Sequence, residues 1–200
     1  MRLVIATGNA GKLKELRELL APPAFDVLPQ SQFTSVSVEE TGLSFVENAI
    51  LKARHAAAAS GLPAIADDSG LEVDALNGAP GIYSARYAGE GASDEANLRK
   101  LLATLQSMPN APRTARYQCA LVFMRSSTDP SPLLCQASWE GRIIDTPRGT
   151  GGFGYDPIFE VSSGVTVAEL PAAEKNRLSH RGKALRGLVA QLREMYPAGS

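Results

Sequence analysis

The sequence has few cysteines, almost no net charge and no long apolar run, and each shortage excludes a class of protein. The two cysteines, Cys119 and Cys135, form no CxxC or Cys/His spacing, so we expect buried thiols and neither metal ligands nor a disulfide framework. A net charge of −1 gives no overall basic field that would recruit nucleic acid. No apolar stretch approaches the length of a membrane span and no charged-then-apolar leader opens the chain, so we expect a cytoplasmic protein without membrane contact.

What is present is the composition of an ordinary globular enzyme, with 200 residues of which 44% are hydrophobic and 20% charged. A chain of this length can bury a sizeable core by itself. It has no repeat and no linker, so we predict a single domain over residues 1–200. Apolar runs alternate with segments of helical periodicity, and two long β-like runs at Ala115–Met124 and Leu133–Ile144 suggest an antiparallel hairpin. The pattern predicts a mixed α/β sheet in two lobes.

Several predicted helices have clear ends. Asn9 is a candidate N-cap for a helix from Ala10, because its side chain can accept from a free backbone N–H. Ser44 and Glu47 have capping-box spacing ahead of a helix that we expect to end at Gly61. Further helices are predicted from Ser93 to about Gln106 and from about His180 to Met195.

The stretch Ala64–Gly70 carries the strongest chemical signal, because an apolar run that reads as a buried strand ends in Asp67-Asp68-Ser69-Gly70. Ligands of open α/β sheets collect beyond the carboxyl ends of such strands. Adjacent acids there are costly to desolvate unless a cation or a proton offsets their charge. Asp, Ser and Gly are also favoured turn residues, so this stretch alone supports a metal-and-base site and an ordinary turn about equally.

A second signal is Thr7-Gly8-Asn9-Ala10-Gly11-Lys12, which lies between the predicted strand Arg2–Ala6 and the following helix. A helix N-terminus offers free N–H groups and the positive end of the dipole, and Lys12 adds a charge, so the segment suits phosphate. It is not a Walker A loop, because Leu13 stands where a Ser or Thr would hold magnesium. The structural alternative is a capped helix after a tight turn.

Three further segments complete the set. Glu39-Glu40-Thr41-Gly42 offers loop carboxylates, and Glu40 with Asp67 or Asp68 would meet the preference of Mg²⁺ for hard oxygen ligands. Residues 151–156 place Phe153 on a glycine-rich background, where its ring can stack on a nucleobase. The basic run 175–183 reads as a helix start, where cations oppose the dipole unless an anion is bound. Together these segments indicate a magnesium-dependent reaction on a nucleotide.

The order of the motifs carries a family resemblance. The chain closely resembles the inosine/xanthosine triphosphate pyrophosphatase family, in its bacterial form, over nearly its whole length. The matching segments are residues 7–12, 40–42 with 45–49, 66–71, 78–87, 152–157 and 179–182. The resemblance implies an elongated α/β fold with two lobes around a central cleft, a homodimer, and hydrolysis of ITP, dITP or XTP to the monophosphate and pyrophosphate, which cleanses the nucleotide pool.

The resemblance also implies roles for individual residues. Asp68 would be the proton acceptor and, with Glu40, would hold Mg²⁺, while Lys12 would stabilise charge during catalysis. The implied substrate-binding residues are Thr7, Gly8, Asn9, Ala10, Gly11, Lys12, Ser69, Phe153, Gly154, Tyr155, Asp156, Lys175, His180 and Arg181. Asp67 is expected to support Asp68.

Two other functions remain to be weighed. One is a phosphatase that uses an aspartate of the Asp67-Asp68 pair as nucleophile and releases orthophosphate. The other is a regulatory module that binds a nucleotide without turnover. The paired acids argue against the second, because binding alone would not need so much negative charge beside a triphosphate.

Overall fold

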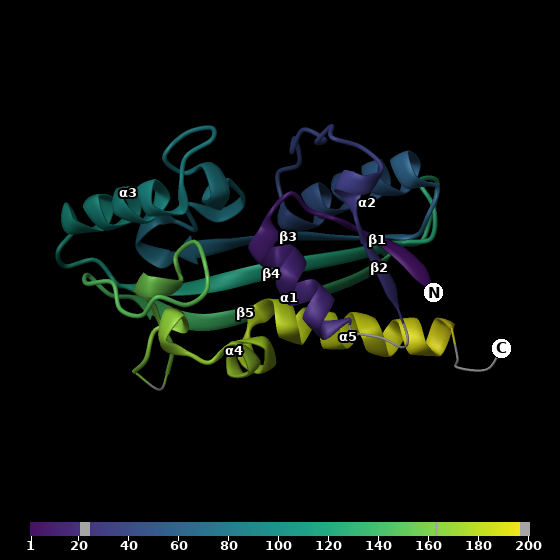
Figure 1. Cartoon of the computed structure of the whole chain (residues 1–200). Coiled ribbons are helices and arrows are strands. Elements are labelled where there is room, and N and C mark those ends of the chain that lie inside the picture. The colour runs from purple at the N-terminus through teal and green to yellow at the C-terminus, as the bar shows by residue number, and fades with distance from the viewer. Residues whose placement is uncertain (21–24, 163, 197–200) are drawn as a thin grey trace. The chain divides into compact units, whose positions relative to one another are not determined.

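The computed structural model describes residues 1–20, 25–162 and 164–196, and its strands form one six-stranded sheet (Figure 1). The strand order is β2-β1-β3-β4-β5-β6. The strands are β1 (Arg2–Ala6), β2 (Asp26–Pro29), β3 (Ala64–Val73), β4 (Thr114–Met124), β5 (Leu133–Ile143) and β6 (Phe159–Glu160). Strand β1 pairs in parallel with β2 and with β3, whereas β5 pairs antiparallel with β6, so the predicted mixed sheet is confirmed.

Among the described residues, an α-helix follows each of β1, β2 and β3 in the chain, and two more α-helices follow β6. They are α1 (Ala10–Leu19), α2 (Phe45–Ser60), α3 (Asp94–Gln106), α4 (Ala172–Leu178) and α5 (His180–Met195). Short 3-10 helices lie at Gln30–Gln32, Asp74–Leu76, Gly81–Arg86, Asp156–Ile158 and Val167–Glu169. None of the helices in the described ranges is long and apolar enough to cross a membrane.

The chain forms two compact units, and each is assembled from separate segments. Unit 1 comprises Met1–Asp68, Cys119–Ala137 and His180–Ser200. Unit 2 comprises Ser69–Gln118 and Ser138–Ser179. The boundary between the units falls inside β3, between Asp68 and Ser69, so the central motif contributes residues to both.

Unit 1 is a sheet covered by helices on both faces. Alternate residues of each strand point to opposite faces, so Leu3, Ile5 and Ile65 pack with Leu16 of α1 and Leu188 of α5. The other face packs against α2, which contributes the small buried side chains Ala49, Ala53, Ala56 and Ala57. Burial on both faces explains why β1 and the start of β3 read as unbroken apolar runs.

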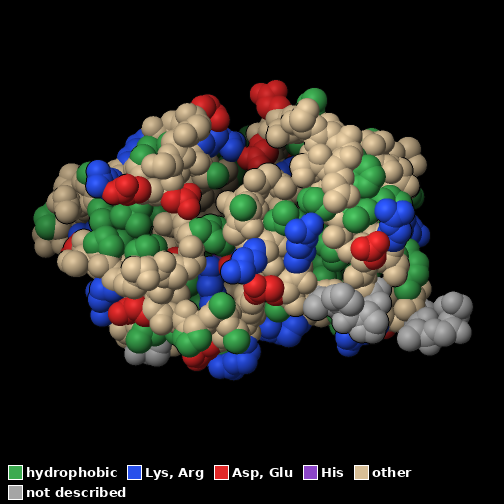
Figure 2. Space-filling view, viewed as in Figure 1, with side chains coloured by type: hydrophobic (Ala, Val, Ile, Leu, Met, Phe, Trp, Pro, Cys, Tyr) green, Lys and Arg blue, Asp and Glu red, His purple; other side chains and the backbone are tan. Residues whose placement is uncertain are grey.

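Unit 2 has its own core. Leu98, Leu101 and Leu105 line the buried side of α3, and the rings of Tyr117 and Phe159 lie 4.5 Å apart between centroids. Both cores are apolar, and the predicted thiols Cys119 and Cys135 are buried and not joined in a disulfide. On the face of the molecule in Figure 2, Lys and Arg are interspersed with Asp and Glu, in keeping with the small net charge.

The predicted helix ends are confirmed where they depend on local capping. Asn9 accepts a hydrogen bond from the backbone N–H of Lys12, and Ser44 accepts one from the N–H of Glu47. Gly61 ends α2 in the left-handed region with φ of 67°, which glycine adopts without a side-chain penalty. Ser93 caps α3 in the same way as Ser44 caps α2.

Two local predictions were wrong. The strand that was expected to end before Asp67 continues as β3 to Val73, so the acids lie within a strand and not in a turn. Cationic side chains from neighbouring helices pair with both carboxylates, so the two acids can be buried without solvent to offset their charge. The basic run was expected at one helix start, and only its second half, His180 to Lys183, lies there, at the beginning of α5. Lys175 and Arg177 lie in the last turn of α4, where cations favour the dipole.

Candidate functional site

The predicted phosphate loop leads from β1 into the first turn of α1. Thr7 Oγ1 accepts from the backbone N–H of Asn9 at 3.1 Å, and Asn9 Oδ1 accepts from that of Lys12 at 3.0 Å. Gly8, Asn9 and Ala10 are exposed. The turn therefore presents the start of the helix, with its positive dipole end, to solvent, as an anion-binding loop requires.

Asp67 joins three segments of unit 1 through its carboxylate. Lys12 Nζ lies 2.6 Å from Asp67 Oδ1, and Arg181 Nε donates to Oδ2 at 2.8 Å. The Cys119 thiol also donates to Oδ2, at 3.4 Å, and the Arg181 guanidinium pairs in addition with Glu15 of α1. Burial acts to raise the pKa of Asp67, but Arg181 and Lys12 outweigh it and hold that pKa well below its usual range. Asp67 is thus a permanent anion that fixes Lys12.

Asp68 is paired differently, because a lysine of α2 bridges it to Glu40. Lys52 Nζ lies 2.5 Å from Asp68 Oδ1 and 3.1 Å from Glu40 Oε1. Burial disfavours the charge on Lys52, yet the Asp68 and Glu40 carboxylates outweigh it and raise the pKa of the lysine. Burial raises the pKa of Asp68 despite the opposing charges of Lys52 and Lys12. The lysine holds the two predicted metal ligands around one positive charge.

The donor set fits a magnesium ion. Asp68 Oδ2 is buried and has no hydrogen-bond partner among the described residues, so one carboxylate oxygen is available for a ligand. Within the same ranges, no group of three or more His, Cys, Asp or Glu side chains is arranged around a common point. Mg²⁺ keeps several waters and often takes only one or two carboxylates with substrate phosphates, so Glu40 and Asp68 suffice as protein ligands.

Gly42 explains how the Glu40 loop reaches this position. Its backbone N–H donates to Oδ1 of the fully buried Asn48 at 2.8 Å. A Cβ atom on Gly42 would lie 2.6 Å from Glu47 Cβ and 2.9 Å from the backbone nitrogen of Asn48, which no side chain tolerates. The glycine of Glu40-Thr41-Gly42 therefore allows the loop to lie directly on the start of α2.

Unit 2 holds a second cluster, around Asp156. Asp156 Oδ2 accepts from Lys175 Nζ at 2.8 Å and from the backbone N–H of Phe153 at 2.9 Å, while Oδ1 accepts from the Tyr117 hydroxyl at 3.0 Å. Lys175 Nζ also lies 4.6 Å from the centroid of the Phe153 ring. The half-buried ring is fixed through its backbone and by the cation beside it, which suits a stacking platform.

The predicted site residues therefore fall into two groups. Unit 1 contains residues 7–12, Glu40, Asp67, Asp68, His180 and Arg181, and unit 2 contains Ser69, residues 153–156 and Lys175. Arg181 was expected near the base and sugar, and the structure pairs it with Asp67 and Glu15. Its role toward substrate stays a prediction.

Sequence reasoning missed Lys52 and Glu15. Lys52 lies in an apolar helical segment and precedes Asp68 by 16 residues, so nothing local links the two. Glu15 follows Lys12 by three residues, which places both on one face of α1 and could have indicated it.

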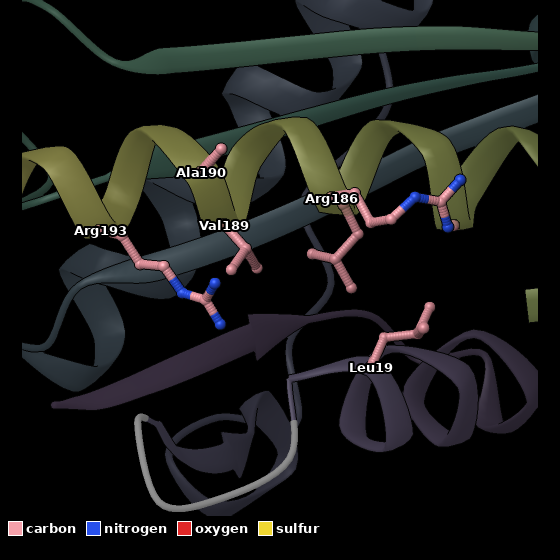
Figure 3. A pocket seen from close by; sticks show the side chains of 7 residues that line it. Leu19, Arg186, Val189, Ala190 and Arg193 are labelled. Atoms are coloured by element: carbon pink, nitrogen blue, oxygen red, sulfur yellow. The ribbon is translucent and has the colours of Figure 1, made fainter. Parts of the chain in front are cut away.

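A cavity of about 370 Å³ lies elsewhere in unit 1, between α1 and α5 (Figure 3). Leu19 points from α1 toward α5, Val189 and Arg193 project from α5 into the space between the helices, and Arg186 extends along α5 (Figure 3). The described residues that line it include no carboxylate and none of the predicted site residues. The cavity does not match the chemistry of a magnesium site.

Comparison with known proteins agrees with the motif order. The curated relatives include dITP/XTP pyrophosphatases of Thioalkalivibrio sulfidiphilus, 62% identical over 96% of this chain and 98% of the relative, and of Shigella flexneri, 60% identical over 96% and 98%. Among solved structures, a HAM1 protein of Coxiella burnetii has a TM-score of 0.89 at 49% identity and covers 97% of this chain and 99% of its own. The Ham1 protein of Staphylococcus aureus has a TM-score of 0.84 at 43% identity, over 98% and 100%.

These likenesses cover both units and the predicted motifs. The Ham1 family model matches residues 3–191, which include the phosphate loop, the acids of β3 and the Phe153 segment. The chain belongs to the Ham1 family.

Proposed function

We propose that the chain hydrolyses nonstandard purine nucleoside triphosphates, with ITP, dITP and XTP as substrates, to the nucleoside monophosphate and pyrophosphate. The observation that carries the proposal is the pair of Glu40 and Asp68 around Lys52, with one buried Asp68 oxygen open to a ligand. The names of the relatives, dITP/XTP pyrophosphatase, support the same activity and substrate class.

The reaction is largely an electrostatic task for the chain. Water attacks the α-phosphorus, and the departing pyrophosphate carries much negative charge. Lys12, held by Asp67, and the N–H groups at the start of α1 stabilise that charge. Because Lys12 is already fixed by a buried anion, little reorganisation is needed when the triphosphate binds.

Asp68 accepts the proton of the attacking water. Its raised pKa, caused by burial, makes its carboxylate a stronger base than an exposed aspartate. Glu40 and Asp68 would hold Mg²⁺, which supplies positive charge to the triphosphate when bound. Lys52 lies between these two carboxylates and is placed to exchange its contacts with them for contacts with phosphate oxygens.

The Phe153 ring provides the surface on which a purine stacks, and Lys175 and Asp156 hold that ring in place. Stacking alone does not choose between purines. Polar groups that match a 6-keto oxygen and leave a 6-amino group facing another donor would supply that choice.

The decisive test is the identity of the products. Purified protein with ITP and Mg²⁺ should release IMP and pyrophosphate in equal amounts. Chromatography measures the IMP, and a pyrophosphate assay measures the second product. Orthophosphate as the first product would favour the aspartate-nucleophile phosphatase, and tight binding without turnover would favour the regulatory module. A panel of ITP, dITP, XTP, ATP and GTP then ranks the substrates.

We also infer a homodimer, Mg²⁺ dependence and a cytoplasmic location from the family resemblance. Light scattering of the purified protein tests the first, and titration of activity with EDTA and Mg²⁺ tests the second. Fractionation of cells that express the chain at native levels tests the third.

A further inference from the structure

A carboxylate outside the predicted site holds the Phe153 segment. The backbone N–H of Gly154 donates to Asp94 Oδ2 at 2.7 Å. Asp94 is the first residue of α3, which lies 60 positions earlier in the chain, and both residues belong to unit 2. Nothing in the family motifs or in the sequence pattern singles out Asp94.

Each of the neighbouring residues in the segment is also attached at a defined point. The Phe153 N–H donates to Asp156, and the Tyr155 hydroxyl donates to the carbonyl of Ser84 at 2.8 Å. Gly154 has φ of +63°, and a Cβ there would meet nothing within 4 Å. Glycine is thus needed at 154 for its backbone conformation and not for space, and the Asp94 contact maintains that conformation.

The start of α3 has other stabilising groups besides this carboxylate. The cap of α3 is Ser93, whose hydroxyl accepts from the N–H of Ala96. Glu95 lies in the same first turn, complements the dipole, and pairs with Arg99 along the helix. Asp94 alone among these acids points to another segment, so its contact serves the Gly154 turn.

We propose that Asp94 is a positioning residue that presets residues 153–156 for the nucleobase. This inference rests on the proposed function, because it assumes that the Phe153 ring receives the base. A tethered turn needs no ordering when the base binds, whereas a free glycine-rich turn loses entropy at that step. Asp94 touches no reacting group, so it acts on substrate binding and not on the chemical step.

The test compares Asp94→Ala with Glu95→Ala, which removes an acid from the same turn of the same helix. The expected result for D94A is a KM for ITP about threefold to tenfold higher, the size of one lost charge-assisted hydrogen bond at an exposed site. The kcat stays within about twofold, since the chemistry is unchanged. Calorimetric binding of IMP should weaken by the same factor as KM rises, and E95A should match the parent in both.

Two further variants sharpen the assignment. Asp94→Asn keeps a side-chain oxygen that can accept from Gly154 and should restore most of the affinity. Gly154→Ala should also raise KM, because φ of +63° lies in the left-handed region, which strains alanine. Since both changes loosen one turn, the double variant should fall short of the product of the single effects.

Unchanged KM and IMP affinity in D94A, with an active parent, would overturn this inference and leave the proposed function intact. A fall in kcat at constant KM would also overturn it. A parent that neither binds IMP nor hydrolyses ITP would overturn the proposed function and this inference together.

Discussion

Lys52→Met isolates the charge balance of the predicted metal site. The change keeps the length and apolar stem of the side chain and removes the ammonium that pairs with Glu40 and Asp68. Removing one member of a buried ion pair typically costs about 3–5 kcal/mol, because the partner charge is left uncompensated. The side chains of Lys52 and Glu40 are 16% and 26% exposed, so solvent screens part of the interaction. We therefore expect the free energy of unfolding to fall by about 2–3 kcal/mol.

Such a loss is measurable and should respond to magnesium. For a protein of this size it lowers the melting temperature by about 4–12 °C in EDTA. Because Mg²⁺ would replace the missing charge without displacing an ammonium, the variant should bind the ion more tightly than the parent. At about one hundred times its Kd, the ion contributes about 2.7 kcal/mol to the folded state, which is enough to cancel the deficit.

The assay is thermal unfolding in EDTA and across a Mg²⁺ series, without nucleotide. The matched control is Arg54→Met on the same helix, since Arg54 is exposed and its guanidinium donates to the carbonyl of Ser127, away from Glu40 and Asp68. Equal melting temperatures of K52M and R54M in EDTA would refute this reasoning. Equal stabilisation of both variants by Mg²⁺ would refute it as well.

The other predictions concern single side chains. Asp68→Asn should lower kcat by about 10²–10⁴-fold, and near-parent turnover in steady-state kinetics would remove the base assignment. Lys12→Ala should raise the KM for ITP more than it lowers kcat, which the same kinetics decide. Phe153→Ala should weaken IMP binding by about 1–3 kcal/mol, measured by calorimetry against the parent. The Arg125 guanidinium holds the pKa of Asp129 well below its usual range, so the ionised carboxylate stabilises the fold at neutral pH and this contribution is lost on acidification. In urea unfolding, Asp129→Asn should therefore have a lower free energy of unfolding than the parent, and the difference should narrow below about pH 4.

Local chemistry made much of the fold predictable from sequence. The ends of α2 and α3 follow from Ser44, Gly61 and Ser93, whose side chains or backbone act within one turn of the helix. The strands β1 and β4 follow from apolar runs that are buried by helices. The family motifs added the order of the elements, which alternation alone does not specify.

The site was harder to predict, because it depends on contacts between distant segments. Asp67 and Asp68 are adjacent and chemically identical, yet Arg181, 114 residues from Asp67, pairs with one and Lys52 with the other. No local pattern separates them. The strand β3 was predicted to stop at these acids because their charge is costly to bury, and the cations that offset the charge come from elsewhere in the chain.

The continuation of β3 through the acids also has a geometric result. Successive side chains of a strand point to opposite faces, so Asp67 and Asp68 are directed apart even though they are neighbours. Their different partners follow from this alternation: Asp67 lies on the side of α1 and α5, and Asp68 on the side of α2. A turn at this point, as one interpretation of the sequence had it, would not have divided the two roles so cleanly.

The segmented layout of unit 1 bears on how the protein matures on the ribosome. The helix α5, which follows all of the strands, supplies Arg181 to Asp67 and covers the face that includes Leu3 and Ile5. Until that helix leaves the exit tunnel, the nascent chain carries an uncovered apolar sheet and a buried aspartate that lacks one of its cations. The first strands to be made are therefore fully covered only after α5 has been synthesised, and until then the emerging chain exposes an apolar surface that chaperones can bind.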